Sequence, residues 1–122
     1  MLFRSVLLAH AEPRILEATV ALGLPLTTPV TIVEEGRLRS ELDSIRQRGY
    51  ALEEEEAEPG LRGVAAPVRD FSGQVVAAIG ISGPTHRMSP DVSLGIVREL
   101  LDVAGTVSMR LGYQSPQAVR RA

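Results

Sequence analysis

Residues 49–87 read GYALEEEEAEPGLRGVAAPVRDFSGQVVAAIGISGPTHR, and this stretch decides the fold. Its last third alternates between branched and small side chains, the period-two pattern of a β-strand. The alternating sets are Val75, Ala77, Ile79 and Ile81 against Val76, Ala78, Gly80 and Ser82. A run just before it repeats the pattern, with Gly63 and Ala65 on one face. The stretch predicts a β-hairpin over Leu61 to Ser82, turning at residues 71–74, with one bulky and one hollow face. Because protein interiors are densely packed, another element or a ligand must fill the hollow face.

The rest of the chain predicts helices and one short strand. Gly23, Gly49 and Gly112 are expected helix ends, and Ser89-Pro90-Asp91 is a strong helix start. The expected elements are helices over Leu2–Ala9, Arg14–Leu22, Glu35–Arg48 and from Ser89 to Leu111, an irregular segment over Leu24–Thr31, and a strand over Tyr50–Glu53. Helices around an antiparallel hairpin indicate an α+β layer architecture.

The last helix carries an unusually broad apolar surface. Its expected stripe comprises Val92, Ile96, Leu100, Val103, Val107 and Leu111, broadened by Val97, Leu101 and Ala104. A stripe of this width predicts burial both on the sheet and on a partner subunit. The polar residues 114–122 predict a flexible C-terminal tail.

Composition narrows the class of protein. The 122 residues suit a single domain, and a hydrophobic fraction of 44% supports a core. The absence of cysteine excludes disulfides and fits a reducing cytosol. Thirteen basic residues are balanced by fifteen acidic ones, which makes the chain by itself a poor candidate for nucleic-acid binding. No apolar run approaches the about 20 residues that span a bilayer, so we expect no membrane partner.

The order and spacing of several short motifs resemble one known family. The motifs are Arg48-Gly49-Tyr50, Glu53 to Glu56, Gly60, Val64-Ala65-Ala66-Pro67-Val68, Gly73, Ala77-Ala78-Ile79 and Ile81-Ser82-Gly83-Pro84, with weaker matches at Leu7-Leu8-Ala9 and Leu111-Gly112. Together they resemble the C-terminal effector-binding domain of IclR-type bacterial transcriptional regulators. The resemblance implies a GAF- or profilin-like antiparallel sheet flanked by helices. It also implies that residues 1–113 form an effector-binding, ligand-sensing domain that is N-terminally truncated relative to the family and lacks its winged helix-turn-helix domain.

The resemblance further implies effector contacts at Glu53, Gly63, Gly80 and Ser82. The two glycines offer only backbone groups and space, and Ser82 stands near the mouth of the expected hollow. Glu53 suits a ligand hydroxyl or amine and repels an anionic effector. The alternatives are structural: Ser82 satisfies a backbone group at a strand end, and the glutamates face water.

The residues give little support to catalysis. His10 and His86 are the only histidines, and neither has the neighbours of a serine-hydrolase site. The segment 80–84 lacks the ending of a phosphate loop, and close His or Cys pairs for a metal are missing. We therefore expect no catalytic activity, no metal and no cofactor.

These observations predict a cytoplasmic sensor of a small organic effector, such as an organic or aromatic acid. We expect it to self-associate as a dimer or tetramer and to reach DNA only through a domain absent from this chain. The alternative is a stand-alone dimerisation module with no ligand. A small enzyme on a related scaffold would instead show turnover that depends on Ser82 or Glu53.

Overall fold

A computed structural model describes residues 2–22, 34–55 and 58–115. Its elements in chain order are α1 (Leu2–Ala9), α2 (Pro13–Ala21), α3 (Glu35–Arg48), β1 (Ala51–Glu54), β2 (Leu61–Arg69), β3 (Val75–Pro84), the 3-10 helix η1 (Thr85–Arg87) and α4 (Pro90–Arg110). These bounds confirm the predicted helices to within two residues. The expected irregular segment, Gly23 and most of the expected tail lie outside the described residues.

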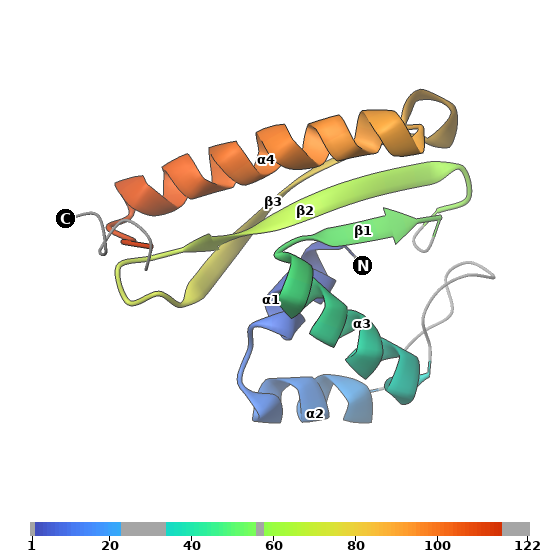
Figure 1. The fold of residues 1–122 in the computed structure, drawn as a ribbon. Helices are drawn as coiled ribbons and strands as arrows, with labels where there is room; N and C mark the ends of the chain where they lie inside the picture. The colour runs from blue at the N-terminus through green and yellow to red at the C-terminus, as the bar shows by residue number, and fades with distance from the viewer. Residues whose placement is uncertain (1, 23–33, 56–57, 116–122) are drawn as a thin grey trace.

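The sheet is antiparallel, with strand order β1-β2-β3 (Figure 1). The predicted hairpin is confirmed as the β2–β3 pair. Its turn closes where the Gly73 N–H donates to the Asp70 carbonyl oxygen at 3.0 Å. Gly73 has a φ of 83°, which favours glycine. The β2–β3 register shifts between Val68 and Arg69, so the hairpin carries an irregularity close to its turn.

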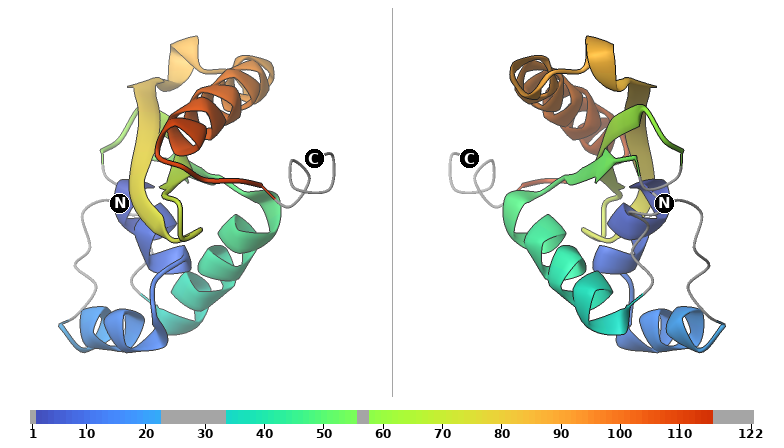
Figure 2. Two further views of the ribbon diagram at one scale, coloured as in Figure 1. Left: turned by 90° about the vertical axis from the view of Figure 1, so that its left-hand side faces the viewer. Right: turned by 90° about the vertical axis from the view of Figure 1, so that its right-hand side faces the viewer.

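Helices cover both faces of this sheet (Figures 1 and 2). On one face α4 packs on β2, joining Val64, Ala66 and Val68 to Val97, Leu100 and Ala104. On the other face α1 and α3 form a second core with Val6, Leu38, Leu42, Ile45 and Ala65, and Leu16 of α2 joins it. The molecule is therefore α+β with a central antiparallel sheet, as the sequence predicts.

The sheet-facing surface of α4 differs from the expected stripe. Its buried residues are Ser93, Val97, Leu100, Ala104 and Ser108, whereas Val92, Val103 and Leu111 are exposed. The sheet therefore buries only part of the expected stripe, and burial of the rest on a partner subunit stays a prediction. The helix is apolar around more than one flank, and the side that faces the sheet combines Val97 and Leu100 with smaller residues.

Among the described residues, no helix is long and apolar enough to cross a membrane.

Candidate functional site

The four predicted site residues lie on one face of the sheet. Glu53 pairs with Gly63 across β1 and β2, and Gly63 pairs with Ser82 across β2 and β3. Directly opposite residues in antiparallel strands place their side chains on the same face. Gly80 lies two residues before Ser82 on β3 and pairs with the buried Ala65. The structure therefore brings the four positions together on the face that α1 covers.

Gly63 lies where three elements approach closely. A Cβ at this position would lie 2.8 Å from Ser82 Oγ and 2.9 Å from Cδ2 of Leu2 in α1. Real Cβ atoms do not approach other heavy atoms so closely, so only glycine fits without a shift of its neighbours. The Ser82 hydroxyl and the Leu2 side chain thus meet over the Gly63 backbone.

Gly80 likewise allows a close approach, in this case of Phe3, the next residue of α1. A Cβ there would lie 2.9 Å from Cε1 of the Phe3 ring and 2.9 Å from the Val64 carbonyl oxygen. The small-residue face is therefore confirmed, and the first turn of α1 fills it. The sequence indicates the small face but not which element covers it.

Glu53 and Ser82 are the two polar side chains at this site, and they differ in exposure. Glu53 is buried, with 6% of its surface exposed, whereas Ser82 is exposed. Glu54, the residue after Glu53, points to the opposite face of the sheet, where its carboxylate lies 3.5 Å from Arg62 Nε. The expectation that Glu53 is the inward glutamate is confirmed. Glu53, Gly63 and Ser82 form a cross-strand row. This row offers a buried carboxylate that accepts hydrogen bonds and an exposed hydroxyl that donates or accepts them.

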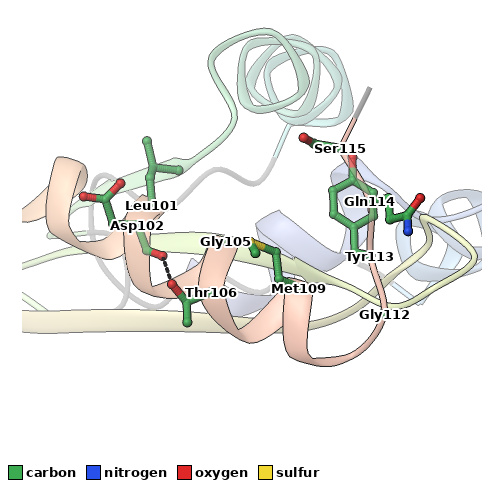
Figure 3. Close-up of a pocket in the computed structure, with 9 residues that line it drawn as sticks. All are labelled: Leu101, Asp102, Gly105, Thr106, Met109, Gly112, Tyr113, Gln114 and Ser115. Carbon is green, nitrogen blue, oxygen red and sulfur yellow. Dashed lines mark hydrogen bonds between the residues drawn. The ribbon is translucent and has the colours of Figure 1, made fainter. Parts of the chain in front are cut away.

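Sequence reasoning missed a hollow on α4. A cavity of about 550 Å³ lies beside Leu101, Gly105 and Met109 and is bounded by residues 112–115 (Figure 3). It includes none of the four predicted site residues. The signal available in the sequence is Gly105, which removes a side chain from the middle of an apolar helix.

No group of three or more metal-ligating side chains occurs within residues 2–22, 34–55 and 58–115.

Comparison with known proteins agrees with the α+β fold. A family model described as "Bacterial transcriptional regulator IclR C-terminal" matches residues 4–109. The HTH-type transcriptional repressor AllR of Klebsiella pneumoniae is 44% identical over 107 residues, which cover 85% of this chain and 38% of that protein. The chain thus spans well under half the length of this relative, whose name is that of a repressor and not of an enzyme.

Two solved structures are similar in fold. The C-terminal domain of the E. coli transcriptional regulator KdgR matches with a TM-score of 0.85 and 33% identity, over 93% of this chain and 70% of that chain. The inducer-binding domain of the PobR transcription factor from Acinetobacter, a double mutant in complex with 3-hydroxybenzoic acid, matches with a TM-score of 0.82 and 29% identity. That match covers 88% of this chain and 63% of the PobR chain.

Proposed function

The chain belongs to the IclR family of bacterial transcriptional regulators, and on this basis we propose that it senses a small organic effector and self-associates. The observation that carries the sensing proposal is the cross-strand row of Glu53, Gly63 and Ser82, with Gly80 beside it. The row combines two polar side chains with two glycines whose backbone is covered only by Leu2 and Phe3 of α1.

The effector we propose is an organic or aromatic acid. The PobR domain, similar in fold, is solved with 3-hydroxybenzoic acid, a compound with both a carboxylate and a hydroxyl. In our proposal the Ser82 hydroxyl and backbone amides bind the effector carboxylate, while Glu53 accepts a hydrogen bond from an effector hydroxyl. Such pairing keeps the two carboxylates apart, because like charges close together are unfavourable.

Binding at this row requires a change in α1. Leu2 and Phe3 lie over Gly63 and Gly80, in the space that an effector would enter. Phe3 is 48% exposed, so its ring leaves this position at a smaller cost than a buried ring. We infer that the effector displaces the first turn of α1, and that this movement couples binding to the arrangement of the subunits. An effector can shift that arrangement only by binding one form better than the other.

The relatives are helix-turn-helix regulators of greater length. We therefore propose that contact with DNA occurs through a domain outside this chain and that the protein acts in the cytoplasm.

A thermal-shift screen with acetate, 3-hydroxybenzoate and gluconate tests the sensing proposal. A ligand at one hundred times its dissociation constant adds about 2.7 kcal/mol to stability and so raises the melting temperature. We expect at least one compound to raise it, and Ser82→Leu to abolish the shift by filling the space above Gly63. Ser44→Leu, the same substitution on the exposed surface of α3, is the matched control and should keep the shift. An equal shift in Ser82→Leu would place the ligand elsewhere and overturn the assignment.

One observation favours the second candidate, a dimerisation module with no ligand. The face of the sheet that carries the four residues is already filled by Leu2 and Phe3. The module predicts self-association with no thermal shift for any compound of the panel.

A further inference from the structure

One flank of α4 combines a protruding leucine with a hollow. The cavity of about 550 Å³ is lined there by Leu101, Gly105 and Met109 (Figure 3). A Cβ at Gly105 would meet no atom within 4 Å, so the hollow is open above this position. Leu94 lies eleven residues earlier on the helix and is 55% exposed. At about 100° per residue, eleven residues return to nearly the same side of a helix.

The flank faces the β1 side of the molecule. Leu94 borders a smaller hollow together with Leu52 and Glu54 of β1, which fixes its direction. Leu101 lies between Leu94 and Gly105 along the helix, lines the edge of the larger hollow and is 37% exposed. The flank therefore presents a protruding apolar side chain at Leu94 and, about 16 Å further along the helix, a gap at Gly105.

A two-fold axis makes this flank complementary to itself. An axis perpendicular to α4 that passes beside the helix at the level of Leu100 sets two helices antiparallel. It brings the level of residue 94 to that of 106, 95 to that of 105 and 98 to that of 102. Leu94 of one copy then lies against the hollow beside Gly105 of the other. Leu101 lies close to the axis and near its own counterpart.

The same axis pairs opposite charges. Arg98 and Asp102 are both exposed, and neither side chain forms an ion pair within the part of the chain that the structure describes. The axis places Arg98 of each copy at the level of Asp102 of the other, which gives two opposite-charge pairs for one interface. The fit of Leu94 to the hollow at Gly105 and the pairing of Arg98 with Asp102 therefore indicate the same antiparallel register independently.

We propose that this flank of α4 is a self-association surface for a second copy of the chain, packed antiparallel, with Leu94 in the hollow at Gly105 and Arg98 paired with Asp102. The proposal rests on the self-association in the proposed function, and its test requires no effector. It adds the helix flank, the register and the residues that make the contact.

A charge-swap experiment on the 122-residue chain tests this register. The proteins are the wild type, Arg98→Asp, Asp102→Arg and the double variant, and sedimentation velocity over a concentration series measures the dimer dissociation constant. In each single variant residues 98 and 102 carry the same charge, and the two-fold axis brings them together at two places in the interface. We therefore expect about a tenfold or greater rise in the dissociation constant. The double variant restores opposite charges and should return to within about threefold of the wild type.

A second variant tests the hollow without altering charge. Gly105→Met adds a side chain into open space, so it should leave the thermal stability of the fold intact while weakening the dimer. A wild-type chain that stays monomeric throughout the series would overturn both the self-association and this interface. A wild-type dimer that none of the variants weakens, or that the double variant does not restore, would overturn this interface alone.

Discussion

His10 lies at the end of α1, among positive charges from two other elements. Burial is the main cause that lowers its pKa below the ordinary value of 6.5, and the charges of Arg69 and Arg46 lower it further. Arg46 is held there because its Nη1 donates to the Ala9 carbonyl oxygen at 2.7 Å. The fold therefore favours the neutral imidazole, whereas the unfolded chain protonates at the ordinary pKa.

This difference predicts a pH dependence of stability. The unfolded state binds more protons below pH 6.5, so the contribution of His10 is complete above that pH and is lost as the pH falls through the lowered pKa. His10→Gln removes the titration, and its free energy of unfolding should fall less than that of the wild type between about pH 7.5 and pH 5.5. Urea unfolding at several pH values measures the free energy of unfolding of the wild type and of His10→Gln.

The matched control for this prediction is His86→Gln, which replaces an exposed histidine in η1. It removes one histidine without altering the surroundings of His10, so its pH slope is the reference for His10→Gln. If His10→Gln also kept that slope, the environment assigned to His10 would be wrong.

At the scale of elements, the sequence predicts what a helix or strand is, but only in part what it packs against. Gly63 and Gly80 identify a small-residue face, yet a small face fits a ligand and a helix equally well. The choice of α1 depends on Leu2 and Phe3, which are remote from both glycines in sequence. Glu53 is easier to place, because strand alternation separates it from Glu54.

The orientation of α4 is harder to predict for a related reason. Hydrophobicity alone cannot choose among several apolar flanks of one helix. Ala104 and Ser108 face the sheet, where Ser108 Oγ accepts a hydrogen bond from the Arg69 backbone N–H at 2.9 Å. That amide lies at the shift in the β2–β3 register, so a serine hydroxyl replaces a strand partner. The periodicity of the sequence cannot predict a hydrogen bond between residues so far apart in the chain.

Ser108 therefore provides a test of how α4 is attached. Ser108→Ala leaves a part-buried backbone N–H without its acceptor, and we expect a loss of about 1–3 kcal/mol in the free energy of unfolding. Chemical denaturation measures the loss. Thr106→Ala, two residues earlier, removes only a hydroxyl that bonds within the helix on its exposed side, and should change stability by less than about 0.5 kcal/mol. Equal effects would mean that the bond to Arg69 contributes nothing.

At the scale of the whole molecule, the two helical layers do not cover all of the apolar surface. On α4 the residues Leu101 and Val103 are 37% and 52% exposed, on flanks that lie about 160° apart around the helix. Exposed apolar surface beside a hollow is typical of interaction sites. The flank with Leu101 also carries the protruding Leu94, the hollow and the charges, whereas Val103 lies on the other flank.

This asymmetry predicts which flank supports self-association. Leu101→Asp brings two carboxylates together near the proposed two-fold axis, so it should lower the molar mass that light scattering measures at a given concentration. Val103→Asp introduces the same charge on the same helix, away from that axis, and should leave the mass unchanged. An unchanged mass for Leu101→Asp would exclude this flank as a contact. A loss of mass in both variants would mean that added negative charge on α4, and not its position, weakens association, so the comparison separates a specific interface from general repulsion.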